Sequence, residues 1–288
     1  MTLPETHAGG AVYLLSKASG VTSRTAAREV AVAWGVKKHG HAGTLDPDAA
    51  GVLPVLLGKA TRLSPYLTGH SKRYRFALVL GVATDTGDAA GRVLATSDAG
   101  GIEAPAVLDA LEAFTGSFEQ RVPEFSALHL GGVRAYEKAR RGTPAEMPVR
   151  KASARDWVLH GFGGARAELE VTVGAGTYIR GLARDIGSAL GVGAHAAGIL
   201  RVAVGSFGIE RCSTAPDAPS SLLTAAEAMS GFPSLALDES QVREIGHGMP
   251  LGSLLRGVIA LLGPGGKLVA VGNGDGHMIR PATVLEAS

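Results

Sequence analysis

The stretch GHAGTLDPDAAGVLPVLLGKATRL, from Gly40 to Leu63, joins a turn that carries two acids to a run of apolar residues. Asp46 precedes Pro47, which biases Asp46 towards an extended backbone, and the proline ring fixes its own φ angle. Such a turn can hold a carboxylate rigidly, as covalent or acid–base catalysis requires. Asp46 could equally be a turn-former, because Asp commonly bonds the backbone of tight turns. The turn by itself leaves both interpretations open.

The segments on both sides of this turn have the patterns of strands and helices. Strands are predicted at residues 11–17, 51–57, 71–84 and 166–173. Helices are predicted at residues 22–35, 105–116 and 222–229, and after a glycine-rich turn within 174–191. Because strands and helices mix without a regular βαβ rhythm, we expect an α+β fold with a mixed, largely antiparallel sheet flanked by helices.

Two of these strands carry further information. Pro54 lacks a backbone N–H, so it places the strand at 51–57 at a sheet edge or at a bulge. In the strand at 71–84, Tyr74 and Phe76 share one face, whereas Arg73 and Arg75 share the other. We therefore expect the tyrosine to face the interior and the arginines to face solvent.

The sequence also predicts how the chain divides. The stretch STAPDAPSS at 213–221 has the composition of a linker, and after one helix the tail alternates short apolar strands with Gly/Pro turns. We expect a large domain at 1–212, a linker and helix at 213–231, and a small β-rich domain at 232–288.

Composition and motifs exclude several classes of protein. The chain has 288 residues, of which 45% are hydrophobic and 19% charged, so it can bury a sizeable core. We find no apolar run long enough for a membrane span and no signal-peptide pattern at the start, and the single Cys212 fits a reducing compartment. We therefore expect a cytoplasmic protein without a membrane anchor.

Cofactor and metal motifs are missing from the sequence as well. No His or Cys pair has zinc spacing, and the glycine-rich stretches GAGTYIRG and GPGGK lack the dinucleotide and Walker patterns. There is no G-x-S-x-G nucleophile elbow either. We predict neither a metal nor a cofactor.

Charge is distributed unevenly along the chain. Residues 49–84 contain five basic residues and no acids, whereas residues 85–120 contain seven acids and one arginine. Residues 121–156 are again basic, with eight basic residues against four acids. This alternation suggests a focused positive surface of the kind that binds nucleic acid, although solvated faces of ordinary elements would give the same pattern.

An opening segment and five further motifs together resemble the signature of the TruB family of pseudouridine synthases. KASGVTS resembles the opening motif of that family, and the stretch around Asp46 resembles its catalytic motif. The others are KRYRFALVLGVATDTGDAAG, VPEFSAL with RAYEKARRG, and GTYIRGLARDIG followed by GAHAAGILR. The segments occur in the family's order and span most of the chain. The resemblance implies the pseudouridine synthase fold and a PUA-like RNA-binding domain at the C-terminus.

The resemblance also implies a reaction and a substrate. Asp46 matches the catalytic aspartate that attacks a flipped uridine in the T loop of transfer RNA, at position 55, either at C6 of the base or at C1′ of the ribose. The base detaches, rotates and reattaches through C5, without metal, nucleotide or redox cofactor. The base must leave the stack for this to happen.

Further site residues follow from matches to the family motifs. Tyr74 matches the tyrosine that stacks on the base, and Arg180 matches an arginine expected to pair with the catalytic Asp46. The other substrate-binding matches are His41, Asp88, Tyr178 and Leu200. From the basic segments we expect RNA-backbone contacts at Lys72, Arg73, Arg75, Arg140 and Arg141, and we expect a further contact at Lys17.

The chain departs from the family pattern at a few positions. Ala18 replaces a proline, Ala50 a threonine, Phe125 a tyrosine and His129 a lysine. Phe125 keeps the ring but loses a hydroxyl group, and His129 weakens a fixed positive charge. These departures affect RNA affinity and loop closure more than the reaction.

We expect a stand-alone enzyme, a monomer that acts on the T arm of transfer RNA without an obligatory protein partner. A guide-RNA-dependent synthase is an alternative within the superfamily, which the short tail disfavours. A transfer RNA chaperone without catalysis and a general nucleic-acid-binding protein are alternatives from other classes. Neither needs Asp46 in a pocket, although chaperone and synthase activity could coexist.

Overall fold

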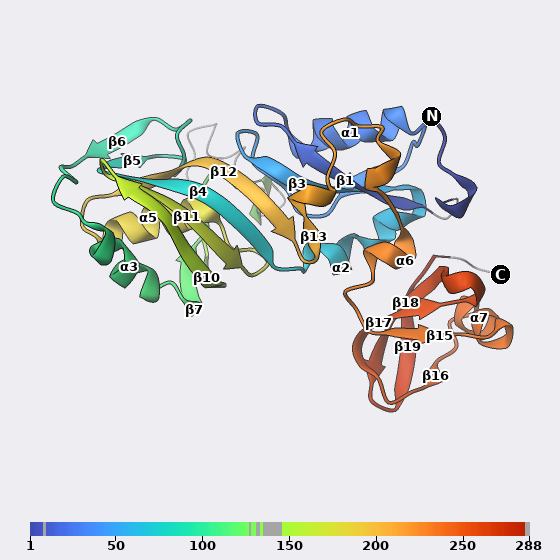
Figure 1. The fold of residues 1–288 in the computed structure, drawn as a ribbon. Helices are drawn as coiled ribbons and strands as arrows, with labels where there is room; N and C mark the ends of the chain where they lie inside the picture. The colour runs from blue at the N-terminus through green and yellow to red at the C-terminus, as the bar shows by residue number, and fades with distance from the viewer. Residues whose placement is uncertain (8–9, 127, 131–132, 135–145, 286–288) are drawn as a thin grey trace. The chain divides into compact units, whose positions relative to one another are not determined.

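The computed structural model describes residues 1–7, 10–126, 128–130, 133–134 and 146–285 of the chain (Figure 1). It divides into two compact units. The first unit comprises Met1–Pro47, Gly51–Gly69 and Val204–Ser288, and the second comprises Asp48–Ala50 and His70–Ala203. In the described residues, we find no helix with the length and apolar character that crossing a membrane requires.

Antiparallel strands form the base of the first unit. β1 (Ala11–Lys17) lies between β14 (Leu222–Thr224) and β3 (Ala50–Leu57), and β2 (His39–His41) runs along β3. The helix α1 (Ser23–Ala33) begins after Thr22, whose side chain accepts a hydrogen bond from the Thr25 amide. The predicted strand at 11–17 and the predicted helix after Thr22 are therefore confirmed. The short helices are α2 (Ser64–Thr68) and α6 (Ala225–Ala228), with 3₁₀ turns at Glu5–His7, Gly58–Leu63, Ile209–Arg211, Pro219–Ser221 and Pro264–Gly266.

The prediction that Pro54 marks an edge or a bulge is wrong. β3 is paired on both sides, with β1 and with β2, and Pro54 lies opposite Leu14 in an unshifted register. Its carbonyl oxygen accepts a hydrogen bond from the Ala42 amide at 2.9 Å, so its backbone polar atoms point towards the β2 side. β2 ends at His41, opposite Val55, and the missing N–H of proline therefore interrupts neither ladder.

The helix predicted at 222–229 is shorter than expected. Residues Leu222–Thr224 pair with β1 as the strand β14, because the apolar side chains of Leu222 and Leu223 are buried there. The helix α6 starts only after Thr224, which forms a capping box with Glu227.

The C-terminal part of the chain forms its own five-stranded sheet. The strand order is β15 (Ser234–Ala236), β17 (Arg256–Leu262), β18 (Leu268–Asp275), β19 (Met278–Val284) and β16 (Leu251–Gly252), with α7 (Glu239–Gly246) beside it. One set of its apolar residues forms a separate core that includes Ile245 and Ile259, which confirms the predicted β-rich tail. Another set, which includes Ala260 and Leu268, joins the core of the first unit. The exact domain boundary near residue 232 stays a proposal.

Within the second unit, five neighbouring strands form a sheet. Its strand order is β12 (Ala194–Val204), β4 (Lys72–Leu80), β11 (Arg166–Val173), β10 (Val149–Gly163) and β7 (Gly116–Arg121). The helices α3 (Ala104–Glu112) and α5 (Ile179–Ala189) pack side by side on this sheet (Figure 1). Two short strand pairs are β5 (Val82–Thr84) with β6 (Val93–Thr96) and β8 (His129–Leu130) with β9 (Val133–Arg134). The short strand β13 (Phe207–Gly208) pairs with β12.

The two faces of β4 are as the sequence predicts. Tyr74, Phe76 and Leu78 are buried, whereas Arg73 and Arg75 are exposed. The arginines therefore lie on the face of the sheet opposite to Tyr74, since successive side chains of a strand alternate between the two faces.

Candidate active site

The loop that carries Asp46 lies in the first unit, and the backbone on both sides of the acid is anchored. The Ser23 hydroxyl group donates to the carbonyl oxygen of Leu45 at 2.9 Å and accepts from the Leu45 amide at 2.8 Å. On the other side, the Pro47 carbonyl oxygen accepts from the Gly20 amide at 2.9 Å and from the Lys17 ammonium at 3.0 Å. Asp46 itself is half-buried. The turn therefore holds the carboxylate in place.

Lys17 has a different position from the one that the sequence suggests. The side chain is only 2% exposed, and its ammonium group donates to the carbonyl oxygens of Ala18, Val21 and Pro47 at 2.7–3.0 Å. These three acceptors match the three N–H donors of an ammonium group. This burial does not fit the predicted contact with RNA phosphates. It fits a structural role, in which Lys17 ties the segment at 18–21 to the loop of Asp46.

In the second unit, Tyr74 lies beside two buried cations. The guanidinium group of Arg201 is fully buried, and its Nη1 atom lies 3.5 Å from the Tyr74 hydroxyl oxygen. The Lys72 ammonium donates to the His70 carbonyl oxygen at 2.7 Å. Burial and the nearby charge of Arg201 lower the pKa of Lys72 to about 8. Lys72 is buried, and the predicted phosphate contact at this residue stays a prediction.

Arg180 is held by three groups of the second unit. Its Nη1 atom donates to the Thr86 carbonyl oxygen at 2.8 Å, and its Nη2 atom donates to the Phe125 carbonyl oxygen at 2.7 Å. Its Nε atom forms an ion pair with Asp88 at 3.6 Å. The structure thus brings together two of the predicted substrate-binding residues, Arg180 and Asp88. The Thr86 hydroxyl also donates to the Asp88 carboxylate, at 2.6 Å.

The remaining predicted residues occupy separate elements. His41 ends β2, Tyr178 directly precedes α5, and Leu200 lies on β12 next to Arg201; all three side chains are half-buried. Arg140 and Arg141 lie outside the described residues. Since Asp46 and Arg180 belong to different units, the pairing between them stays a prediction.

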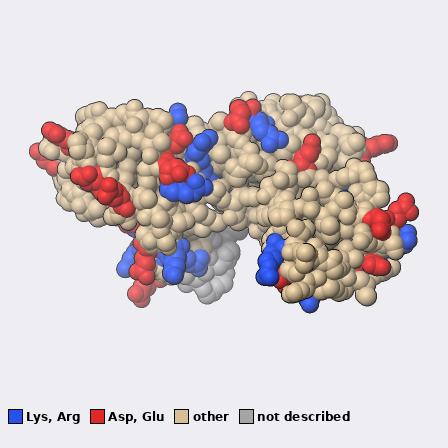
Figure 2. Space-filling view, turned by 60° about the horizontal axis from the view of Figure 1, so that its bottom comes forward, with Lys and Arg blue, Asp and Glu red and all other residues tan. Residues whose placement is uncertain are grey.

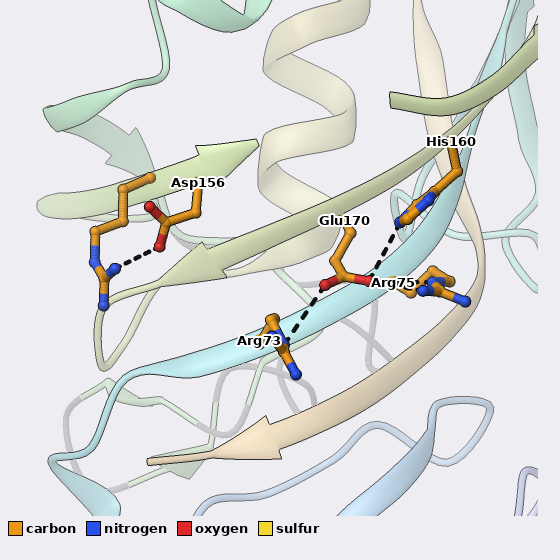
Figure 3. Close-up of polar contacts among 6 residues, drawn as sticks. Arg73, Arg75, Asp156, His160 and Glu170 are labelled. Atoms are coloured by element: carbon orange, nitrogen blue, oxygen red, sulfur yellow. Dashed lines mark hydrogen bonds and ion pairs between the residues drawn. The ribbon is translucent and has the colours of Figure 1, made fainter. Parts of the chain in front are cut away.

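Arg73, Arg75 and His160 surround one carboxylate on the exposed face of the sheet (Figure 3). Glu170 accepts hydrogen bonds from Arg75 at 2.9 and 3.2 Å and lies 3.5 Å from Arg73 and 3.3 Å from His160. Burial alone would raise the pKa of Glu170, but the hydrogen bonds from Arg75 and His160 and the charges of both arginines outweigh it and lower the pKa.

The predicted positive surface is thus partly neutralised at this face. About half of the Arg73 side chain remains exposed, so it stays accessible to a phosphate. On the face that Figure 2 shows, Lys and Arg side chains lie next to Asp and Glu side chains in several places. Basic segments of the sequence therefore do not map directly onto basic patches, because acids from other strands lie beside them.

The Glu170→Gln variant should be less stable than the wild type at pH 7 by at most about 1 kcal/mol, the usual range for accessible ion pairs. Because the folded pKa of Glu170 is lowered, its contribution is present above the ordinary carboxyl pKa of 4.5 and disappears as the pH falls below it. Thermal unfolding at pH 7 and pH 3.5 measures this. A stability difference that is the same at both pH values would contradict the assigned role.

Sequence analysis missed several polar residues that the structure places around these groups. Arg201 interrupts the apolar strand ILRVAV, and a charge in a buried strand was a readable signal. Ser23 resembles an ordinary helix-start residue, and its bonds to Leu45 could not be anticipated. Gln120 is buried on β7, a strand that the sequence did not reveal.

Comparison with known proteins identifies the family. Residues 31–179 match the model of the TruB family pseudouridylate synthase N-terminal domain, and residues 232–286 match that of the tRNA pseudouridine synthase II C-terminal domain. Two proteins named tRNA pseudouridine synthase B are each 36% identical to the chain. The one from Syntrophotalea carbinolica matches 89% of this chain and 90% of its own length, and that from Thermobifida fusca matches 96% and 99%.

Solved structures agree at the level of the fold. A chain from an H/ACA RNP bound to a substrate RNA containing 2′-deoxyuridine superimposes with a TM-score of 0.73 at 23% identity, covering 99% of this chain and 88% of that one. A chain from an archaeal box H/ACA sRNP Nop10-Cbf5 complex gives a TM-score of 0.74 at 22% identity, covering 99% and 89%. Family models match residues 31–179 and 232–286, and relatives align over nearly the whole length of the chain. The chain therefore belongs to the TruB family of pseudouridine synthases.

Proposed function

We propose that this chain isomerises the T-loop uridine at position 55 of transfer RNA to pseudouridine, with Asp46 as the nucleophile. The observation that carries the proposal is the double anchoring of the Asp46 loop, through Leu45 on one side and Pro47 on the other, in a chain of this family. A nucleophile that is fixed before the substrate binds saves the entropy of positioning it in the transition state. The relatives described above are named tRNA pseudouridine synthases, which supports action on transfer RNA.

The reaction is an isomerisation, so its atoms balance within the nucleotide. The Asp46 carboxylate attacks C6 of the base or C1′ of the ribose, and the bond between C1′ and N1 breaks. After rotation of the base, C5 bonds to C1′ and the bond to Asp46 breaks, because C5 displaces the carboxylate from C1′ or the carboxylate is eliminated from C6. The hydrogen on C5 leaves as a proton, and N1 gains a proton. This reaction scheme needs no oxidant, metal or nucleotide cofactor.

Each predicted substrate-binding residue has a place in this scheme. Tyr74 stacks on the extruded base, an interaction that contributes about 1–3 kcal/mol per base. Arg180 pairs with Asp46 and orients its carboxylate, and Asp88 contacts the nucleotide. His41, Tyr178 and Leu200 line the space into which the uridine flips.

We further propose that the enzyme acts as a cytoplasmic monomer on the T arm, without a guide RNA or an obligatory protein partner. The alignment with proteins named as tRNA enzymes supports this over guide-dependent action. The solved structures that match the fold come from RNP complexes, but at 22–23% identity they speak for the fold alone. A transfer RNA chaperone activity can coexist with catalysis.

The test is incubation of the purified chain with an unmodified T-arm stem-loop, with no other RNA or protein present, followed by nucleoside analysis. Pseudouridine in the product supports the proposal. Formation that needs an added guide RNA would instead favour the guide-dependent class. Binding of full-length transfer RNA with faster refolding but without pseudouridine would favour the chaperone.

A further prediction concerns Arg140 and Arg141, for which the sequence predicts phosphate contacts. Replacing both with glutamine should reduce the slope of log affinity against log salt by about 1.4–1.8, since each lost contact contributes about 0.7 for single strands and 0.9 for duplex. RNA binding is measured by filter binding at several salt concentrations. Arg155→Gln is a matched control, because this exposed arginine already pairs with Asp156. An unchanged slope in the double variant would show that these arginines do not touch RNA.

A further inference from the structure

Gln120 is a buried polar residue to which the proposed mechanism gives no role. It lies on the edge strand β7, where Glu119 and Arg121 on either side of it are exposed, yet its own side chain is only 3% exposed. Burying a carboxamide is unfavourable unless its hydrogen bonds are satisfied. The partners of this amide therefore indicate what it does.

The carboxamide of Gln120 bonds both backbone groups of Tyr178. Its Oε1 atom accepts from the Tyr178 amide at 2.9 Å, and its Nε2 atom donates to the Tyr178 carbonyl oxygen at 3.1 Å. Tyr178 has an extended backbone, so the side-chain amide pairs with it as a neighbouring strand would. The amide also packs directly on the first turn of α5, because a methyl group at Gly181 would come within 2.8 Å of Nε2.

This contact lies next to Arg180. The helix α5 begins at Ile179, directly after the residue that Gln120 holds, and Arg180 is its second residue. The chain segment after β7 also accepts a hydrogen bond from Arg180, through the carbonyl oxygen of Phe125. The segment at 120–125 therefore makes two contacts. The Gln120 side chain holds the backbone of Tyr178, directly before the helix, and the Phe125 carbonyl oxygen holds the Arg180 guanidinium group.

We infer that Gln120 is a positioning residue for Tyr178 and Arg180, an inference that rests on the substrate-binding roles proposed for these two residues. Gln120 does not touch the uridine. It sets the backbone from which the Tyr178 ring and the Arg180 guanidinium extend. Small displacements of such groups lower the rate of the chemical step more than they lower RNA affinity, since a misplacement of about 1 Å can cost about 10²-fold.

Two variants and one control test this inference. Gln120→Glu keeps the size of the side chain and can still accept from the Tyr178 amide, but its ionised form cannot donate to the carbonyl oxygen. Gln120→Met removes both hydrogen bonds. Gln241→Met is the control, because Gln241 also bonds a backbone amide, that of Asp238, but on α7 in the C-terminal sheet domain.

Single-turnover rates at saturating T-arm RNA should fall by about 10–100-fold in both Gln120 variants, with the RNA dissociation constant changed less than about threefold. The Gln120→Glu rate, relative to wild type, should recover as the pH falls from 8 to 5.5, because burial at this position raises the pKa of the introduced carboxyl group, and the protonated group donates as the amide does. The Gln120→Met ratio should stay flat, and the control should match the wild type. Rates equal to wild type in both Gln120 variants, or the same pH dependence in both, would overturn the inference.

A measurement on the wild type keeps the inference testable even when a variant does not fold. The Tyr178 amide should exchange its hydrogen slowly, because it is donated to Gln120. Exchange as fast as that of an exposed amide would overturn the inference. If the wild type forms no pseudouridine, the proposed function fails. If it does so while the Gln120 variants keep its rate, only the role of Gln120 fails.

Discussion

The Asp46→Asn variant should form pseudouridine at least about 10³-fold more slowly than the wild type, because an amide cannot replace a carboxylate nucleophile. RNA affinity should stay within about tenfold, since the loop is held by Leu45 and Pro47 and not by the Asp46 side chain alone. Single-turnover assays on the T-arm stem-loop and a separate binding measurement distinguish the two effects.

Asp48→Asn is the matched control for this experiment. It removes an acid from the same turn, two residues away, where the side chain is exposed. Its rate should stay within about threefold of the wild type, because it loses no group that the mechanism uses. Wild-type turnover by the Asp46→Asn variant would refute the assignment of the nucleophile.

The Lys17→Met variant should lose about 2–4 kcal/mol of stability. The methionine fills the space of the lysine stem but removes the donor to the carbonyl oxygens of Ala18 and Val21, whereas the Pro47 oxygen keeps the Gly20 amide. A buried unsatisfied polar group costs about 1–3 kcal/mol. Part of the loss is offset, because the variant no longer buries a charge. The melting temperature should fall by about 5 °C or more.

The same variant should lose at least about tenfold in rate at a temperature where it is folded, because the anchor of the Asp46 loop is weakened. Lys59→Met is the control, an exposed lysine of the same unit whose replacement should leave the melting temperature within about 1 °C. If Lys17→Met melts like the wild type but binds RNA with a reduced salt slope, Lys17 contacts phosphates as the sequence suggested.

Much of the fold could be predicted because its periodic segments are strongly patterned. β4 alternates buried and exposed residues over its first half, and β11 alternates buried residues with less buried ones along its length. The helices α1 and α5 carry apolar residues at helical spacing. β10 could not be predicted, because its burial pattern is largely exposed and Asp156, with a positive φ of 56°, interrupts its register. A strand that buries few apolar residues has little apolar alternation to detect.

In the candidate site, too, some features could be predicted from the sequence and others could not. The position of Asp46 in a rigid turn could be argued from Pro47 alone, whereas the burial of Lys17 and Lys72 could not. Lys17 ends an apolar strand and Lys72 lies in a basic segment, and the partners of both are backbone carbonyl oxygens, which have no sequence signature. Arg201 shows the reverse case: a charge between apolar residues is a readable sign of a buried polar contact, but the contact with Tyr74 was not predicted.

The most direct test of the central claim is site-resolved mapping of pseudouridine in an unmodified transfer RNA transcript treated with the purified chain alone. The account predicts up to one pseudouridine per transcript, at the T-loop uridine, and none with the Asp46→Asn variant. Pseudouridine at other positions with the T-loop uridine unchanged, or an equal yield from the Asp46→Asn variant, would contradict it.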